Sequence, residues 1–144
     1  MHMKVKNNEI RILDLRTFYD DRGGLVSVES SLDIPFEIKR VYYIFSNDKG
    51  LPRGFHAHKK LKQVLICVSG RVEVVCTMGK STERFVLDKP NKALLIEGLV
   101  WRVMENFSEG TVLLVLASEH YQEKDYIRDK SEFELLSSTG IDEE

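Results

Sequence analysis

Short runs rich in β-branched and aromatic residues, separated by turn residues, make up most of the chain. Glycine, proline, aspartate and asparagine mark the breaks, as at residues 20–23 and 88–91. Regularly spaced short strands without helices between them predict an all-β fold, an antiparallel sandwich or barrel. The predicted strands are residues 24–29, 38–45, 55–58, 63–69, 71–78, 83–87, 92–96, 101–106 and 111–118. Helical spacing is confined to the tail and predicts one short helix over about 124–136, from Tyr126, Ile127, Phe133 and Leu136.

Length and charge narrow the class of protein. The 144 residues are expected to form one domain, 1–144, with Met1 and His2 as a cloning remnant and 137–144 as a frayed tail. A net charge of -2 with both signs interspersed argues against a nucleic-acid partner. No apolar run has the length of a membrane span, and no signal peptide is recognisable, so no membrane partner is expected. Cys67 and Cys76 lie in strand-like runs and are expected to be buried free thiols, typical of the cytoplasm.

One motif carries most of the functional information. Gly50, His56, His58, Gln63 and Gly70 follow the spacing G-x5-H-x-H-x3,4-E-x6-G, with glutamine in place of glutamate. This spacing resembles the first motif of the cupin barrels. The resemblance implies a cupin (jelly-roll) β-barrel of antiparallel strands, to which the spacing in the tail adds a short C-terminal helix.

The metal ligands of a cupin are incomplete in this sequence. Metal-binding cupins take His, His and Glu from the first motif and a His from the second, P-x-G-x2-H-x3-N. The counterpart of the second motif here is 96–106, in which the histidine position falls on Arg102 or Trp101, according to the end from which it is counted. Gln63 lacks the negative charge that holds a divalent cation, and a permanent cation at Arg102 would repel one. No metal and no other cofactor is therefore expected.

His56 and His58 are two residues apart, so they project from the same face of a strand. Close to Arg53, two imidazoles can transfer protons beside an anionic or polarised substrate. Histidines that merely pack on a strand are the simpler alternative, and the full motif argues against it. Arg40 and Tyr42 share one strand face, Tyr43 lies on the other, and either tyrosine could relay a proton. Trp101 could be a core residue or a surface on which a base stacks. Arg22 could be a turn residue or could contact the ligand. Tyr121 and Tyr126 are expected to be packing residues.

A more specific resemblance rests on residues 39–45, 52–60, 63–67 and 116–118 together. These segments look like the sugar 3,4-ketoisomerases, and the similarity runs from about Asp20 to Ile127. Such enzymes move the keto group of dTDP-4-keto-6-deoxy-D-glucose from C4 to C3 without a metal, typically as cytoplasmic homodimers. The product is aminated to 3-amino-3,6-dideoxy sugars for antibiotics or for surface glycans such as O-antigens and S-layer glycans.

The resemblance also implies roles for the residues. The Arg-Gly-x-His segment, shared with the more distant dTDP-sugar 3,5-epimerases, implies that His56 is the base at C3. His58 would handle protons at the oxygens or at C4, although the two roles can be exchanged, and Tyr42 completes the catalytic set. The predicted substrate-binding residues are Arg22, Arg40, Tyr43, Arg53, Gln63, Trp101 and Arg102.

Two other functions stay open at this point. A 3,5-epimerase would use the same base together with a tyrosine acid across the ring, and a non-catalytic cupin would bind a nucleotide sugar as a sensor. Some relatives carry Trp-His where this chain has Trp101-Arg102. The combination of Arg102 with Arg22 therefore leaves the C4 configuration of the product open, galacto or gluco.

Overall fold

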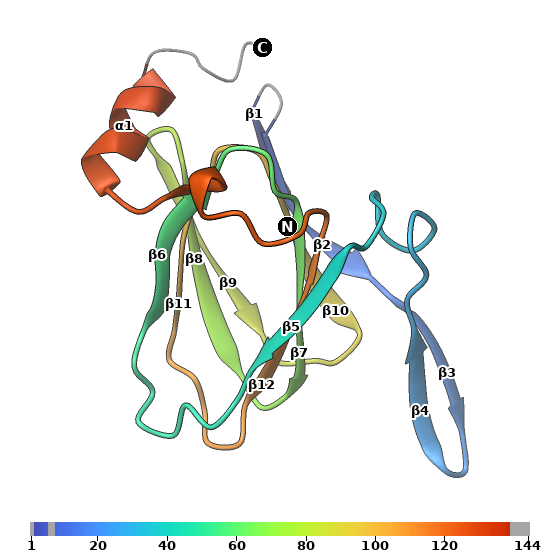
Figure 1. Ribbon diagram of the computed structural model, residues 1–144. Coiled ribbons are helices and arrows are strands. Elements are labelled where there is room, and N and C mark those ends of the chain that lie inside the picture. Colours follow the sequence, from blue (N-terminus) through green and yellow to red (C-terminus); the bar gives the residue numbers. More distant parts are fainter. Residues whose placement is uncertain (1, 6–7, 139–144) are drawn as a thin grey trace.

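Two antiparallel sheets face each other in the computed structural model, which describes residues 2–5 and 8–138 (Figure 1). The larger sheet has the order β1-β2-β10-β7-β12-β5 and the smaller one β13-β6-β11-β8-β9. In the larger sheet the strands are β1 (His2–Val5), β2 (Asn8–Asp14), β10 (Lys92–Glu97), β7 (Gln63–Ser69), β12 (Val112–Ala117) and β5 (Arg40–Ile44). The smaller sheet contains β13 (Tyr126–Ile127), β6 (Arg53–His58), β11 (Trp101–Glu105), β8 (Val72–Met78) and β9 (Ser81–Leu87). This all-β architecture is the predicted one.

The central strands are apolar on both faces because the protein has three layers of apolar packing. In β7, Leu65 and Cys67 point into the core between the sheets, whereas Val64 and Ile66 pack on the outer face. The segment 28–39, which precedes β5, covers that outer face with Ile34 and other apolar side chains. A continuous apolar run is therefore the expected pattern for β7, as in any strand buried on both sides. Cys67 and Cys76 are both buried and free, as predicted.

The C-terminal helix is shorter than the sequence pattern predicts. A 3₁₀ turn, η1 (Glu123–Asp125), and the short strand β13 precede α1 (Lys130–Ser138). The prediction of helix from Lys124 was wrong there because β13 pairs with β6, Tyr126 opposite His58 and Ile127 opposite Ala57. This pairing in the tertiary structure overrides the local spacing. Residues 137 and 138 of the predicted frayed tail belong to α1, so the prediction was wrong for them, and 139–144 lie outside the described residues. Neither helical segment of the described chain has the length and apolar character needed to cross a bilayer.

A two-stranded hairpin, β3 (Arg16–Asp20) and β4 (Gly23–Ser27), projects away from the sandwich (Figure 1). Its strands pair only with each other. Phe18, Tyr19 and Leu25 are 56%, 75% and 60% exposed. The hairpin therefore presents apolar side chains that its own subunit does not cover.

A bulge in β6 determines which way the side chains of the Arg-Gly-x-His segment point. Arg102 lies opposite His56, but the next residue of β11, Val103, lies opposite Gly54, so Phe55 is the extra residue. Phe55 has φ 59° and Gly54 has φ 100°, both in the left-handed region. An inserted residue reverses the alternation of side chains. Arg53 and His56, three residues apart, consequently face the same side of the sheet, where both line one cavity.

We expect Gly54→Ala to destabilise the protein by about 2 kcal/mol or more, because strained φ values and a backbone clash add up. A Cβ at this position would lie 2.9 Å from the carbonyl oxygen of Arg102. Gly79→Ala is the matched control, since Gly79 also has positive φ but open space around it. Thermal unfolding of both variants measures the difference. Equal loss of stability in the two variants would contradict the proposed clash.

Candidate active site

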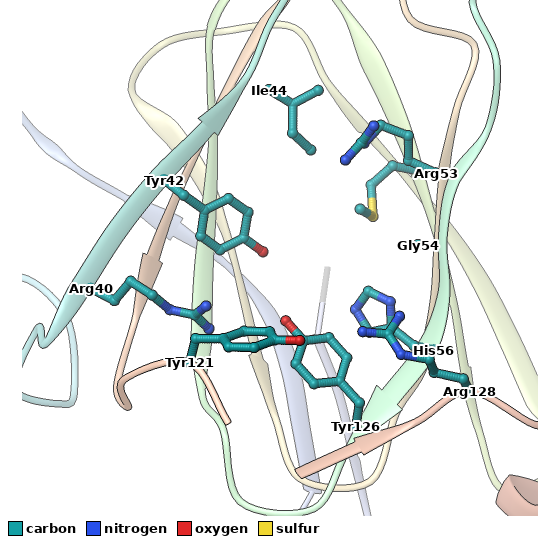
Figure 2. A pocket seen from close by; sticks show the side chains of 10 residues that line it. Arg40, Tyr42, Ile44, Arg53, Gly54, His56, Tyr121, Tyr126 and Arg128 are labelled. Carbon is teal, nitrogen blue, oxygen red and sulfur yellow. The ribbon is translucent and has the colours of Figure 1, made fainter. Parts of the chain in front are cut away.

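A cavity of about 360 Å³ opens between the edge strand β5 and the bulged strand β6 (Figure 2). One wall comes from β5 and the opposite wall from β6 and β11. The segment after β12 forms the third side. The cavity is lined by Arg40, Tyr42, Ile44, Arg53, Gly54, His56, Met104, Tyr121, Tyr126 and Arg128. In Figure 2 the hydroxyl of Tyr42 points across the cavity toward the wall that carries His56.

The two motif histidines lie next to each other, but only one lines the cavity. Their ring centroids are 4.8 Å apart in an edge-to-face arrangement, and the ring of Tyr126 packs against both. His56 is partly exposed to the cavity, whereas His58 is completely buried behind it. Among the described residues, His56 Nδ1 and His58 Nε2 have no hydrogen-bond partner, although both atoms are buried. Unpartnered buried nitrogens of this kind are unusual and often functional.

Both imidazoles are held in the neutral form. Burial, and next to it the charge of Arg102, lowers the pKa of His56 from 6.5 to about 4. The same two causes, in the same order, place the pKa of His58 far below its ordinary value. A neutral imidazole at neutral pH can accept a proton, so both residues can serve as bases.

A chain of hydrogen bonds connects the buried cation Arg102 to the cavity. Arg102 donates from Nη1 to Gln63 Oε1 at 2.5 Å and from Nη2 to the carbonyl of Val100 at 3.0 Å. Gln63 Nε2 in turn donates to the hydroxyl of Tyr42 at 3.0 Å. Burial, followed by the neighbouring Tyr126, raises the pKa of Tyr42, so this phenol is protonated and can donate into the cavity. Gln63 and Arg102 thus orient Tyr42 from beneath without lining the cavity themselves.

Gln63 occupies the motif position of a cupin's carboxylate ligand, and Arg102 is one of the two positions on which the second-motif histidine can fall. Here the two side chains bond to each other. In the part of the chain that the structure describes, no three His, Cys, Asp or Glu side chains lie close enough to share an ion. The donor set of this site therefore does not fit a divalent cation.

Arginines surround the mouth of the cavity. Arg40 lies over the rings of Tyr42 and Tyr121, at 5.3 Å and 5.6 Å from their centroids. Arg128 stacks on Tyr126 at 4.3 Å and donates to Glu123 at 2.7 Å and 3.0 Å, and Tyr121 also bonds to Glu123. Together with Arg53, these guanidinium groups can bind an anion such as a pyrophosphate by bidentate contacts.

Three predicted site residues lie away from this cavity in the isolated chain. Tyr43 points outward from β5 and is 60% exposed, so the alternation of the strand selects Tyr42 as the cavity tyrosine. Trp101 is 6% exposed and packs on Phe133 of α1 in a separate apolar cluster. Arg22 lies at the tip of the β3–β4 hairpin, where it pairs with Asp20.

The sequence reasoning missed several residues of the site. Tyr121 and Tyr126 line the cavity, whereas packing roles were expected for them. Arg128 is a third cation at the mouth, and Asp125 contacts His58. All four come from the segment 121–128, of which residues 124–128 were predicted to belong to the helix. An alternative reading of 126–127 as a strand beside the His-x-His segment would have found them.

Comparisons with known proteins agree with this geometry. The family model described as "FdtA: WxcM-like, C-terminal" matches residues 8–138. The chain belongs to this family of sugar 3,4-ketoisomerases. A TDP-4-oxo-6-deoxy-alpha-D-glucose-3,4-oxoisomerase from Aneurinibacillus thermoaerophilus is 45% identical over 125 residues, 87% of this chain and 90% of the relative.

Solved structures of the family superpose closely on this chain. The TDP-quinovose 3,4-ketoisomerase WlaRB from Campylobacter jejuni is 48% identical, with a TM-score of 0.85 over 91% of this chain and 99% of the other. The 3,4-ketoisomerase QdtA from Thermoanaerobacterium thermosaccharolyticum, as a histidine-to-asparagine variant in complex with TDP-4-keto-6-deoxyglucose, is 42% identical. Its TM-score is 0.90 over 95% of this chain and 98% of the other. These relatives are ketoisomerases, which favours that activity over 3,5-epimerisation.

We expect an NMR titration of His56 to give a pKa well below that of an unfolded histidine, near 4 instead of 6.5, because burial and the charge of Arg102 disfavour its protonation. Arg102→Gln should raise that pKa, since one of the two causes is removed. The chain unfolded in urea is the reference. An unperturbed titration of His56 in the folded protein would contradict the assignment of a neutral base.

Proposed function

We propose that this protein is a metal-independent 3,4-ketoisomerase that converts TDP-4-keto-6-deoxy-D-glucose to its 3-keto isomer. The observation that carries the proposal is the neutral imidazole of His56, which faces the hydroxyl of Tyr42 across a cavity with arginines at its mouth. A base, a phenolic donor and an anion site are what the isomerisation of a nucleotide-linked keto sugar requires. QdtA, a close relative, binds that sugar nucleotide.

The nucleotide sugar enters with its diphosphate at the mouth and its sugar inside. Arg40, Arg53 and Arg128 present guanidinium groups on different walls of the cavity, so they can contact a diphosphate from several sides. The buried Nε of Arg40 has no partner among the described residues and is available for such a contact. The hexose then lies between Tyr42 and His56.

The reaction moves one hydrogen between carbons and one between oxygens. The proton on C3 is acidic because the C4 carbonyl is adjacent, and His56 removes it to give an enediolate across C3 and C4. The proton of the C3 hydroxyl moves to the C4 oxygen with the help of Tyr42 and His58, and protonation of C4 leaves the carbonyl at C3. Nothing is lost or gained overall, so the step needs no oxidant, reductant or cofactor.

The buried charge of Arg102 stabilises the enediolate. Arg102 is 1% exposed, and no described side chain provides a carboxylate that pairs with it. In a site of low dielectric such a charge acts strongly on an anion that develops nearby. Gln63 and Tyr42 extend its influence toward the sugar through the chain of hydrogen bonds.

The remaining proposals concern the setting of the enzyme. We place it in the cytoplasm, in keeping with its two free cysteines. Its 3-keto product would be aminated by a pyridoxal-phosphate transaminase to a 3-amino-3,6-dideoxy sugar for a surface glycan, an O-antigen or S-layer glycan.

The activity is tested with TDP-4-keto-6-deoxyglucose in deuterated water, in the presence of a chelator. We expect NMR to show a ketone at C3 and deuterium at C4, and in a parallel reaction in ordinary water the coupling of H4 to H5 reports the C4 configuration. His56→Asn should lower turnover by about a hundredfold or more, the usual effect of losing a general base, while TDP binding is retained. His120→Asn, the same change at an exposed histidine, is the control.

Three outcomes of this experiment would contradict the proposal. Deuterium at C3 and C5 without a new ketone would indicate an epimerase, and binding without exchange would indicate a sensor. Activity that disappears with chelator and returns with added metal would contradict the metal-independent mechanism.

We also propose that the enzyme is a homodimer in which the N-terminal strands pair across subunits. The exposed apolar side chains of the β3–β4 hairpin need a cover. The outer face of β5 exposes Val41 and Tyr43, and Phe45, just after the strand, is exposed as well. Apolar surfaces of this kind are typical of interfaces. A partner's hairpin on this face would also bring Arg22 toward a second cavity, which accounts for the predicted role of Arg22 in substrate binding.

Light scattering at micromolar concentration should therefore give twice the mass of one chain. The double variant Phe18→Asp with Leu25→Asp should shift the protein to the monomer, because charged residues would be buried in the interface. Val86→Asp, at an exposed valine of β9, is the control. A monomeric mass for the unmodified chain would overturn the proposal.

A further inference from the structure

Asp125 makes an unusually complete set of contacts with the segment that follows the His-x-His motif. Its Oδ2 lies 3.1 Å from His58 Nδ1 and accepts the N–H of Leu61 at 3.3 Å. Its Oδ1 accepts the N–H of Lys60 at 2.7 Å, and its carbonyl accepts the N–H of Lys59 at 3.1 Å. The carboxylate is therefore fixed in position relative to the ring of His58.

The pairing of β13 with β6 explains how this contact arises. Asp125 ends η1, and the next residue, Tyr126, lies opposite His58 in the sheet. The side chain of Asp125 is 15% exposed, and that of His58 is completely buried. The ion pair or hydrogen bond is thus shielded from solvent and should have more effect than one on the surface.

A carboxylate in this position selects one tautomer of the neutral ring. An ionised carboxylate only accepts hydrogen bonds, so Nδ1 of His58 must carry the hydrogen. The lone pair of a neutral imidazole then lies on Nε2, the atom that has no partner among the described residues. A neutral base whose acceptor nitrogen is free and whose other nitrogen is oriented by a third group is the arrangement of a catalytic dyad.

The other groups around His58 are mainly cationic or neutral. Arg102 from β11, Arg40 from β5 and Arg128 from the segment after β13 disfavour a positive charge on the ring, as does His56 from its own strand. Tyr126 packs on its face. Asp125 is the carboxylate in direct contact with it and opposes these charges when the ring accepts a proton.

We propose that Asp125 is a positioning residue of the isomerase, which holds His58 as the Nδ1–H tautomer so that Nε2 can accept and return a proton. The proposal rests on the proposed function. In the reaction, the proton that leaves the C3 hydroxyl reaches the buried Nε2 through the hydroxyl of Tyr42, which lines the cavity: Tyr42 passes its own proton to Nε2 as it accepts that of the sugar. The imidazolium is paired with the carboxylate of Asp125, and the reverse transfer through Tyr42 delivers a proton to the C4 oxygen. His58 ends the cycle as it began, and Asp125 does not change its protonation.

The test is Asp125→Asn, with Asp129→Asn as the matched control. An amide can donate to Nδ1 and so permits the opposite tautomer of His58. Asp129 lies four residues on and accepts the backbone N–H and the hydroxyl of Ser131 at the start of α1, without contact to a histidine. Both variants lose one negative charge and a carboxylate that accepts a backbone N–H. Only Asp125→Asn also changes a contact with the ring of His58.

Three quantities are measured for each variant: the ¹⁵N NMR shifts of His58, kcat and KM with TDP-4-keto-6-deoxyglucose, and the melting temperature. For Asp125→Asn we expect His58 to lose the Nδ1–H tautomer and kcat to fall on the order of a hundredfold, with KM and TDP binding little changed. Asp129→Asn should keep both the tautomer and kcat. A fall in kcat with the tautomer preserved would show that Asp125 only holds the backbone after β6 in place, which would overturn the proposal. An unchanged kcat would overturn it as well.

The unmodified protein offers a test that does not depend on a folded variant. Its His58 must be the Nδ1–H tautomer in the absence of substrate, and an Nε2–H tautomer there would refute the inference. This measurement is independent of activity. A protein with the expected tautomer but without isomerase activity would therefore refute the proposed function and leave the contact between Asp125 and His58 intact.

Discussion

The guanidinium of Arg102 is buried between the two sheets, and the other residues of the site are arranged around this buried charge. A cation without a carboxylate partner is costly to bury, and its position is tolerable only because acceptors surround it. Gln63 Oε1 and the carbonyl of Val100 provide them. Gln63 is thereby turned so that its amide nitrogen meets Tyr42, and the nearby histidines are kept neutral. Together with burial, this one charge keeps both imidazoles neutral, and through Gln63 it orients the phenol.

A cupin barrel that binds a metal keeps its positive charge in the same region with an exchangeable ion. Here the positive charge belongs to the side chain of Arg102, which forms a hydrogen bond with Gln63. A guanidinium cannot act as a Lewis acid by coordination, but it stabilises an anion by charge and hydrogen bonds. Enediolate chemistry needs only that stabilisation and a base. The substitution of two motif residues therefore fits a change from metal chemistry to proton transfer within an unchanged fold.

Much of this could be read from the sequence, because the central strands are buried on both faces and have unmistakable apolar runs. The predicted strand 63–69 is β7 residue for residue, and the His-x-His spacing pointed to β6, the strand that carries His56 on the wall of the cavity. Of the hairpin, β4 was predicted as the strand 24–29, but β3 escaped prediction because it is exposed on most sides and shows little alternation. The segment 121–128 was misread because its structure is determined by pairing with β6, far away in the chain. Local spacing carries no information about such a partner.

The bulge at Phe55 shows why the residues of a site are easier to name than to place. In a regular strand, Arg53 and His56 would lie on opposite faces, so a guanidinium and a base three residues apart would not share a cavity. The extra residue reverses the alternation, and Gly54 makes this possible because the backbone of Arg102 leaves no room for a Cβ. The same local distortion therefore brings together Arg53, the proposed anion contact, His56, the proposed base, and, across the strand pair, the buried cation Arg102. The Arg-Gly-x-His segment is best understood as one structural unit, in which the glycine is as necessary to the chemistry as the histidine.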